Sequence, residues 1–321
     1  MNGEREILQR LISGPVSGNG LAQQAGSTRA AVWKRIQALR EAGLEIDARR
    51  GHGYALRHPL ELLDAEAIRA ALPAAVRSGI ASLDIAWSLD STNSELLRRD
   101  THAHGLAVLL GERQTGGRGR RGRSWVSPLA AHLYLSVARQ YSGGLARLGG
   151  LSIVAGVAVA EALNEAGHEV KLKWPNDLLV EGRKLGGLLV EGSGEYAGPA
   201  RAVVGIGINV RMPEGMAKTI DQPWIDLAGL DAGTCSRNLL AARVLTHLQP
   251  ALAQFDGAGL APFVERYARF DALRGREVRV HGGNREQTGT ALGIAADGAL
   301  RVRVGGREHS VHAGEVTVRA R

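Results

Sequence analysis

A run of arginine and glycine residues is the part of this sequence best suited to hold an anion. Gly117-Arg-Gly-Arg-Arg-Gly-Arg-Ser-Trp125 places four arginines among three glycines within seven residues and ends on a tryptophan. Glycine allows the backbone to approach a ligand closely, and the arginine fork of N–H donors suits phosphate and carboxylate groups. Taken alone, the run fits either a flexible basic loop or an Arg/Gly tract that binds RNA.

Other short segments carry polar side chains of the kinds that bind ligands. They are Asp90-Ser-Thr-Asn93, Lys173-Trp-Pro-Asn-Asp177, Lys184-Leu-Gly-Gly187 and Gly205-Ile-Gly-Ile-Asn-Val210, together with the amide of Gln114. Each has an ordinary structural interpretation: Trp174-Pro175 as core and turn, Lys184 as a solvated charge at a strand end, and the glycines as bulges. Occurring together and in this order, they favour a ligand site.

Alternating strand and helix patterns from about residue 82 predict a mixed sheet covered by helices, an α/β protein of the α+β type. Apolar or alternating runs predict strands at 83–87, 106–111, 132–138, 170–174, 185–191 and 201–210. N-cap residue types at 90–93 predict a helix over 94–99. A run that is apolar almost all round predicts a buried helix over 148–166, and further helices are expected at 236–255 and 260–270.

The first sixty residues predict a winged helix-turn-helix. Helical spacing covers 7–12 and 21–25, and a third helix, capped by Ser27 or Thr28, ends at Gly43. Alternating segments on either side of the glycine turn at 49–54 predict a basic hairpin wing. DNA contacts are expected from Thr28, Arg29, Trp33, Lys34, Arg49 and Arg50. The alternative is a three-helix interaction module that never meets DNA.

Glycine turns after residue 275 separate five short alternating segments, which predict a small β-barrel. The segments are 277–281, 287–292, 300–304, 308–312 and 316–319. We expect His281, His309 and His312 on its surface rather than in a metal set. The domain boundaries predicted from these patterns are 1–62, 63–272 and 273–321.

Composition limits the class of protein. The 321 residues suffice for two or three domains, and the 44% hydrophobic and 22% charged residues are ordinary for a soluble globular protein. A net charge of +8 favours anionic partners such as nucleic acid or nucleotides. The single cysteine, Cys235, excludes an internal disulfide and a cysteine-based zinc site. With no apolar run near the length of a membrane span and no signal-peptide pattern, we expect a cytoplasmic protein.

The ordered motif set resembles that of the biotin–protein ligases, and the resemblance covers nearly the whole chain. The helix-turn-helix ahead of the motifs matches the bifunctional bacterial branch, which also represses the biotin biosynthesis operon. The resemblance implies a central catalytic domain of the class II synthetase-like and SH2-like type and a C-terminal SH3-like β-barrel. Lipoate ligases share the chemistry, but the Lys-Trp-Pro-Asn-Asp and Arg/Gly motifs favour biotin.

The activity implied by the resemblance is a two-step ligation. ATP, with Mg²⁺, activates biotin to biotinyl-5′-AMP, and a lysine of the biotin carboxyl carrier protein then takes the biotinyl group. The carboxylate is already a nucleophile at pH 7, so the first step needs charge neutralisation and alignment rather than a strong base. We expect the Arg/Gly loop to become ordered when the ligand binds and then to shield the adenylate from water.

The resemblance also assigns residues of this sequence to ligands. The biotin site would comprise Ser91, Thr92, Asn93, Gln114, Arg118, Gly119, Arg120 and Lys184. The ATP site would comprise Arg118, Arg120, Arg121, Trp125, Asn176, Asn209 and Arg319. Lys184, Arg118 and Arg120 are the expected catalytic residues. Asp177 is a candidate ligand of Mg²⁺, or instead a group that orients the acceptor lysine.

The bifunctional branch implies a second role, in which biotinyl-5′-AMP is a corepressor that favours a homodimer bound to operator DNA. One alternative is a DNA-binding biotin sensor whose ligase activity has lapsed, which the presence of Lys184, Arg118 and Arg120 argues against. Another is a ligase whose N-terminal domain is vestigial or purely structural.

Overall fold

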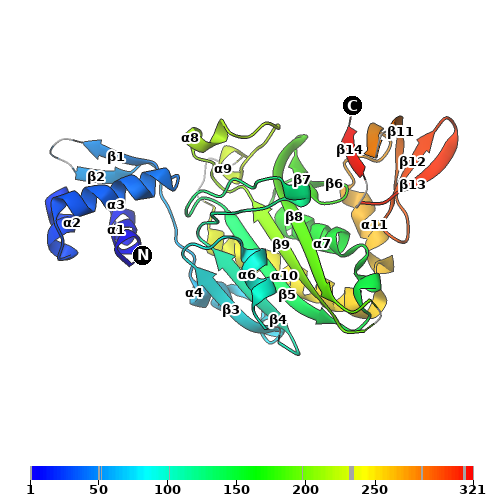
Figure 1. Ribbon diagram of the computed structural model, residues 1–321, viewed down its shortest axis with the longest axis horizontal. Coiled ribbons are helices and arrows are strands. Elements are labelled where there is room, and N and C mark those ends of the chain that lie inside the picture. The colour runs from blue at the N-terminus through cyan, green and yellow to red at the C-terminus, as the bar shows by residue number, and fades with distance from the viewer. Residues whose placement is uncertain are drawn as a thin grey trace.

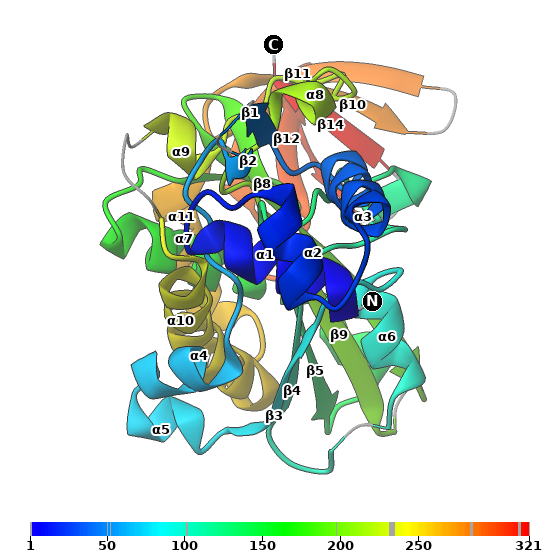
Figure 2. The same cartoon turned by 90° about the vertical axis from the view of Figure 1, so that its left-hand side faces the viewer.

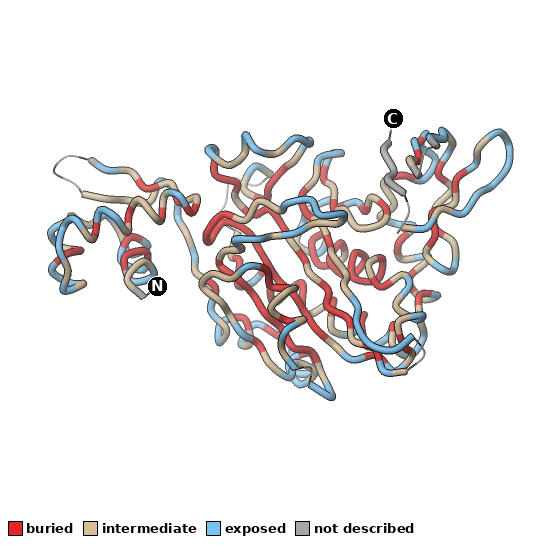
Figure 3. The backbone as a smooth tube through the Cα atoms, in the orientation of Figure 1, coloured by how far each residue is buried: buried red, intermediate tan, exposed pale blue. Residues whose placement is uncertain are grey.

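Three structural units lie in chain order along the long axis of the molecule (Figure 1). The computed structural model describes residues 2–49, 51, 53–100, 102–196, 198–230, 235–282, 285–313 and 316–320. The helix-turn-helix lies at one end, the mixed sheet in the middle and a C-terminal sheet at the other end. Buried residues are concentrated in the middle unit, along the central strands and the helix behind them (Figure 3).

The N-terminal unit is a winged helix-turn-helix, as the sequence predicted. Its elements are α1 (Asn2–Ile12), α2 (Gly18–Gln24), α3 (Arg29–Glu41) and an antiparallel hairpin of β1 (Ile46–Arg49) and β2 (Gly53–Leu56). Thr28 rather than Ser27 caps α3, because its hydroxyl accepts a hydrogen bond from the Ala31 amide at 3.2 Å. Ile36 and Leu39 turn inward from α3 and are fully buried, which leaves the opposite face of that helix in solvent.

The central unit is built on one mixed sheet with the strand order β3-β4-β5-β9-β8-β7-β6. Its strands are β3 (Ile80–Ala86), β4 (Leu106–Gly111), β5 (Leu133–Tyr141), β6 (Lys171–Lys173), β7 (Asp177–Val180), β8 (Arg183–Gly194) and β9 (Ala200–Ile208). β3 and β4 are parallel, and every other neighbouring pair is antiparallel. The six predicted strands are confirmed, and β7 is an addition that begins directly after the turn at 174–176.

Alternation along β4 gives the sheet two differently covered faces. Leu106, Val108 and Leu110 join the main core together with α7 (Leu151–Glu165) and α10 (Arg237–Ala258). Leu109 instead packs with Leu96 of α6 (Thr92–Arg98) in a separate small cluster. Figure 2 shows α10 on one side of the strands and α6 on the other. The buried helices therefore support the sheet from behind, while α6 covers the face that bears polar residues.

The remaining helices are short or peripheral. They are α4 (Ala65–Ala71), α5 (Ala74–Arg77), α8 (Glu214–Ala217), α9 (Leu227–Leu230), α11 (Ala261–Phe270) and the 3₁₀ turns η1 (Arg120–Gly122) and η2 (Leu145–Leu148). Asp64 caps α4 by accepting from the Ala67 amide at 2.8 Å, so this helix begins directly after its N-cap residue.

One helical stretch differs from the expectation that no apolar run approaches the length of a membrane span. Leu145–Glu165 is long and apolar enough, by length and composition, to cross a membrane. The expectation that no apolar run approaches that length was therefore wrong for this stretch. Most of its apolar residues belong to α7, where Val154, Val157 and Leu163 are fully buried beneath the sheet. Its composition is that of the central helix of the hydrophobic core.

The C-terminal unit is a five-stranded antiparallel sheet in the order β13-β12-β11-β10-β14. Its strands are β10 (Glu277–Gly282), β11 (Arg285–Ile294), β12 (Leu300–Val304), β13 (Arg307–Val311) and β14 (Val316–Ala320). The strands and the SH3-like type match the prediction. Over the described residues, however, β13 and β14 are the two edge strands of the sheet, and no hydrogen bonds join them to close a barrel. Val278, Ala291 and Leu300 are buried in the same hydrophobic cluster as α7.

A short segment of the central unit joins the core of the N-terminal unit. Leu129 and Ala130 are buried among the apolar residues of α1 to α3, and the Leu129 amide donates to the Ala42 carbonyl at 2.8 Å. Gly43 ends α3 with a positive φ of 104°, and a Cβ placed there would lie 2.6 Å from Pro128. The segment that includes residues 128–130, which follows the Arg/Gly loop, is therefore part of two units at once.

Candidate active site

A cavity of about 1180 Å³ opens where the β6–β8 end of the sheet meets the Arg/Gly loop and the start of the C-terminal unit. Nearly all of the predicted biotin and ATP residues line it: Ser91, Thr92, Asn93, Gln114, Arg118, Gly119, Arg120, Arg121, Trp125, Asn176, Lys184 and Asn209. Asp177, the candidate ligand of Mg²⁺, lines it as well. These residues come from segments more than a hundred positions apart. The motif set therefore converges on one cavity.

The start of α6 forms one end of this cavity. Ser91 caps the helix, and Ser91, Thr92 and Asn93 are each at most 4% exposed, although all three are polar. Gln114 is fixed against them, because its Oε1 accepts from the Thr92 amide at 2.9 Å and lies 3.1 Å from the Thr92 hydroxyl. Buried, hydrogen-bonded polar groups of this kind give a pocket its specificity.

The Arg/Gly loop is a small hairpin in this structure. Arg118 and Ser124 form an antiparallel bridge, and the Gly119 amide donates to the Arg123 carbonyl at 2.7 Å. Arg121 at the tip has φ 58° and Gly122 has φ 71°, so a left-handed pair of residues makes the turn. We call residues 117–124 the lid. Its expected ordering by ligand stays a prediction.

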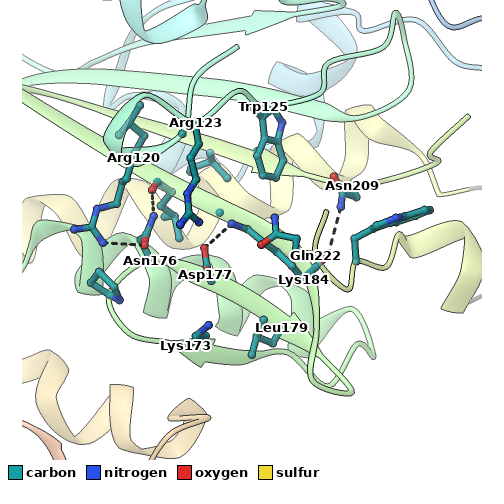
Figure 4. Close-up of a pocket in the computed structure, with 18 of the residues that line it drawn as sticks. Arg120, Arg123, Trp125, Lys173, Asn176, Asp177, Leu179, Lys184, Asn209 and Gln222 are labelled. Atoms are coloured by element: carbon teal, nitrogen blue, oxygen red, sulfur yellow. Dashed lines mark hydrogen bonds and ion pairs between the residues drawn. The ribbon is translucent and has the colours of Figure 1, made fainter. Parts of the chain in front are cut away.

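Arg120 reaches from the lid to two other parts of the chain. One guanidinium nitrogen donates to Asn176 Oδ1 at 3.3 Å, and another donates to the Ala313 carbonyl in the C-terminal unit. Partial burial lowers the pKa of Arg120 from its usual value, but the side chain stays charged. The contact with Asn176 is drawn in Figure 4. The lid is thereby attached to Asn176 in the wall of the cavity and to Ala313 in the C-terminal unit.

Lys184 and Asp177 form an ion pair at the centre of the cavity (Figure 4). The Lys184 Nζ lies 2.7 Å from Asp177 Oδ1, and the two side chains are 17% and 24% exposed. Nζ also lies 5.7 Å from the centre of the Trp125 ring, within the range of a cation–π contact. The Trp125 Nε1 donor is buried with no hydrogen-bond partner in the described part of the protein.

The glycines of β9 have a steric role that the sequence did not reveal. A Cβ on Gly207 would lie 2.8 Å from two atoms of the Trp125 ring, and a Cβ on Gly205 would collide with Asn93 Oδ1. The two glycines let Trp125 and Asn93 lie directly on the sheet. The alternative interpretation of these glycines as a bulge is wrong, since β9 pairs without a register break over this range.

Asn209 and the segment after it close the cavity on the side opposite the lid. Asn209 is 4% exposed, and its Nδ2 donates to the Ile225 carbonyl at 3.1 Å. The Lys184 amide donates to Pro223, and Ile225 donates back to the Lys184 carbonyl. Residues 219–224 line the cavity but were missed by the sequence analysis. Trp224, next to the polar Asp221 and Gln222, was the signal that could have identified them. Contact between Asn209 and nucleotide stays a prediction.

Arg123 is a second omission, because it lines the cavity but was not among the predicted ligand-binding residues. Arg121 lies at the exposed tip of the lid. The backbone of Arg319 pairs with Arg279 across β14 and β10, and the side chain of Arg319 lies outside what the structure describes. Roles of Arg121 and Arg319 toward ATP stay predictions.

Asp177 is the residue proposed for Mg²⁺, and its surroundings limit how the ion can bind. No group of three or more His, Cys, Asp or Glu residues that could hold a metal occurs in the described part of the chain. Asp177 offers one carboxylate, of which Oδ1 faces Lys184, and Asn176 Oδ1 accepts from Arg120. Magnesium commonly binds through one or two carboxylates together with substrate phosphates. The residues present therefore fit an ion that arrives with ATP.

The candidate DNA-binding residues lie on the outer face of the N-terminal unit. Arg29, Trp33 and Lys34 are exposed along α3, with Trp33 54% exposed despite its large apolar ring. Thr28 is the N-cap of the same helix. The backbone of Arg49 ends β1, while its side chain and the whole of Arg50 lie outside the described residues. A helix with cations and an uncovered aromatic ring suits a nucleic-acid groove.

A buried ion pair ties the segment entering the central unit to β4. Arg237 donates to Glu112 at 2.8 Å, with both side chains 3% exposed, and Glu112 Oε1 accepts from the Leu63 amide at 2.6 Å. His132 lies beside this pair, and its burial lowers the pKa of the imidazole to about 3. These groups were not predicted, because nothing local in the sequence joins positions 63, 112 and 237.

Comparison with known proteins agrees with this arrangement. Residues 86–209 match the biotin/lipoate A/B protein ligase family, residues 4–55 an HTH domain, and residues 274–319 the biotin protein ligase C terminal domain. The bifunctional ligase/repressor BirA of Salmonella typhimurium is 39% identical over 95% of this chain and 93% of its own length. That of Escherichia coli is 38% identical with the same coverage.

A solved structure extends the comparison to the fold. The biotin protein ligase from Aquifex aeolicus in complex with biotin and ATP is similar with a TM-score of 0.64 and 27% identity. The similarity covers 75% of this chain and 100% of that one.

Proposed function

The chain belongs to the family of bifunctional biotin ligase/repressor proteins, and on that premise we propose that it joins biotin to a carrier protein at the expense of ATP. The observation that supports this most strongly is the convergence of the pocket residues at the start of α6, Lys184 and the lid arginines on one cavity. A cavity of about 1180 Å³ has room for two ligands side by side.

In the first step, an oxygen of the biotin carboxylate attacks the α-phosphorus of ATP. A carboxylate–phosphorus bond forms, the bond from the α-phosphorus to the bridging oxygen breaks, and pyrophosphate leaves with that electron pair. Two anions must meet, so the barrier is mainly electrostatic and entropic. Lys184, Arg118 and Arg120 bring three positive charges to the cavity and offset this repulsion. Mg²⁺ bound with ATP neutralises charge on the phosphate oxygens, and Asp177 is the residue that would hold it.

The ion pair between Lys184 and Asp177 defines the role of the lysine. Because Asp177 Oδ1 already holds Nζ at 2.7 Å, the ammonium group is positioned before substrate arrives. A ligand phosphate that enters beside it meets an oriented donor, which stabilises the charge that develops on the α-phosphate. Trp125, above Nζ, shields that side of the cavity from water.

The lid then protects the product of the first step. Biotinyl-5′-AMP is a mixed anhydride that water hydrolyses, so it must stay enclosed until an acceptor arrives. Arg120 holds the lid to Asn176 in the wall of the cavity and to Ala313 in the C-terminal unit. In the second step, the amine of a lysine on the biotin carboxyl carrier protein attacks the anhydride carbonyl carbon. The amide bond forms, the bond from that carbon to the phosphate oxygen breaks, AMP leaves with the electron pair, and the nitrogen loses a proton to solvent.

We further propose that the protein represses biotin biosynthesis genes by binding operator DNA as a homodimer, with biotinyl-5′-AMP as corepressor. The exposed cations and tryptophan of α3 support contact with DNA, and two half-sites require two copies of the helix-turn-helix. Both activities belong in the cytoplasm, where ATP, carrier protein and DNA are found together.

The two activities are tested separately. Biotin-dependent exchange between ATP and labelled pyrophosphate reports the first step, with Lys184→Ala as the control that removes the oriented cation. We expect exchange in the wild type and a loss on the order of 10²–10³-fold in the variant. Absence of exchange in the wild type would overturn the ligase and leave a biotin sensor. Operator binding that biotinyl-5′-AMP does not change would overturn the coupled repressor and leave a ligase with a structural N-terminal unit.

A further inference from the structure

Glu191 makes polar contacts beside the biotin pocket that the ligase mechanism does not use. It lies in β8 beyond the Lys184 motif, and its side chain is 27% exposed. Its Oε2 accepts from the Asn93 side-chain amide at 2.8 Å, and its Oε1 accepts from Arg118 at 3.2 Å. One carboxylate therefore contacts both a pocket residue and the first arginine of the lid.

Glu191 ends a continuous series of hydrogen bonds across the pocket. Gln114 Oε1 is bound to Thr92, the Thr92 hydroxyl lies 2.7 Å from Ser136, and Ser136 donates to Asn93 Oδ1 at 2.6 Å. Ser136 is fully buried on the α6 face of β5. The residues expected to hold the biotin head are thus connected, group by group, to Glu191.

The orientation of the Asn93 amide depends on this series. Its Oδ1 faces the Ser136 hydroxyl, and its Nδ2 faces two acceptors, the Leu189 carbonyl at 3.2 Å and Glu191. A flipped amide would place its oxygen against the Leu189 carbonyl and the Glu191 carboxylate, so that acceptor faces acceptor at both of these groups. Asn93 is 3% exposed, so water cannot correct such a mismatch.

We propose that Glu191 is a positioning residue for biotin binding, which acts by holding the Arg118 guanidinium at the edge of the pocket. This inference rests on the proposed function. Arg118 lies between Gly117 and Gly119, where the backbone alone restricts its side chain little. Its guanidinium is fixed instead by Glu191 and by the Ser94 hydroxyl, which accepts at 2.9 Å. Both acceptors belong to secondary-structure elements rather than to the lid.

The strength of the pair suits this task. Arg118 is 46% exposed, so its ion pair with Glu191 is weakened by solvent. Four arginines occur within the lid, and a nearby carboxylate reduces their mutual repulsion when no ligand anion is present. Because the guanidinium has five N–H donors, Glu191 and Ser94 occupy only part of it. The rest can meet a ligand carboxylate without the guanidinium leaving its anchor.

The experiment is a titration of biotin binding by calorimetry, without ATP, for the full-length protein and Glu191→Gln. The glutamine keeps an acceptor for Asn93 but removes the charge that holds Arg118. We expect the Kd for biotin to rise about two- to fivefold, the range for a partly exposed ion pair. In pyrophosphate exchange, the KM for biotin should rise by the same factor with little change in kcat.

Three further variants separate positioning from structure. Ser94→Ala removes the other acceptor of Arg118 and leaves the contacts of Asn93 in place. It should also raise the Kd for biotin. Glu308→Gln breaks a comparable ion pair with Arg301, and neither of these residues lines the cavity, so it should have no effect. In an Arg118→Ala background, Glu191→Gln should cause no further loss, because the residue through which it acts is gone.

The inference is overturned if Glu191→Gln leaves biotin affinity unchanged, tightens it, or weakens it equally in both backgrounds. Tighter binding would mean that Glu191 competes with the ligand for Arg118. Equal weakening would mean that it acts through Asn93 or the sheet. A wild-type protein that binds no biotin and supports no exchange would instead remove the proposed function, and the two failures are therefore distinguishable.

Discussion

Gly207→Ala tests whether close contact between Trp125 and the sheet is needed for catalysis. The added Cβ would lie 2.8 Å from Cε2 and Cζ2 of Trp125 and 3.0 Å from Nε1. Carbon atoms pack best at about 3.5–4.0 Å, so the ring must move outward by roughly 1 Å. Gly207 lies near the end of β9 with no positive φ, and the substitution therefore adds a steric conflict without backbone strain.

Displacement of Trp125 should be costly because of what the ring covers. The centre of the Trp125 ring lies 5.7 Å from Lys184 Nζ, and Trp125 is the first residue after the lid. A misplacement of about 1 Å near reacting groups lowers rates on the order of 10²-fold. We expect kcat/KM for pyrophosphate exchange to fall by that factor. The free energy of unfolding should change by less than about 1 kcal/mol, since the Trp125 ring can move outward into the cavity at little cost to the core.

The assay is steady-state pyrophosphate exchange with biotin and ATP varied in turn, together with urea unfolding. Gly257→Ala in α10 is the matched control, because a Cβ there meets nothing within 4 Å and alanine favours a helix. A Gly207→Ala enzyme with kcat/KM within twofold of wild type would refute the steric argument. A large loss of stability would show that the substitution distorts the sheet itself and does not simply displace the Trp125 ring.

Three other predictions follow from contacts described above. Arg120→Gly removes both attachments of the lid, so biotinyl-5′-AMP should leave on the order of tenfold faster in a chase experiment; slower release than wild type would contradict this. His132 has a folded-state pKa of about 3 against an ordinary 6.5, so its contribution to stability is complete above pH 6.5 and is lost as the pH falls toward 3. Between pH 4 and 6, the unfolding free energy of wild type should fall more steeply than that of His132→Gln, by roughly 1 kcal/mol per pH unit at most. Equal slopes of unfolding free energy against pH, measured by urea titration, would oppose the assignment. Lys34→Ala should reduce the slope of log K against log salt for operator binding by about 1, whereas an unchanged slope would place Lys34 away from phosphate.

Local signals in the sequence predicted most of the elements. Asp64, Thr28 and Ser91 each cap the helix that follows, because an N-cap acts within three residues of its own position. β7 was missed, since it is only four residues long and begins inside a motif interpreted as a turn. Closure of the C-terminal barrel was also inferred from strand number alone, which does not determine which edges pair.

The site was predicted in its members but not in its contacts. The order of the motifs identified Lys184 and Asp177 separately, yet the 2.7 Å pair between them depends on how β7 and β8 are set side by side. Residues 219–224 carry no strong motif and reach the cavity because the Asn209 side chain and the Lys184 backbone hold that segment by hydrogen bonds. Long-range pairing of this kind is decided by the whole fold.

The shared segment at residues 128–130 limits how far the N-terminal unit can be treated as a detachable module. Leu129 is 2% exposed because α1 to α3 cover it, and Trp125 lies four residues away, within about 14 Å of extended chain. Removal of the first sixty residues would leave Leu129 and Ala130 facing water next to the lid. A chimaera that exchanges only residues 1–62 would likewise place a foreign core against them. Transplanting the DNA specificity of one such protein onto the ligase of another therefore requires residues 128–130 to travel with the helix-turn-helix.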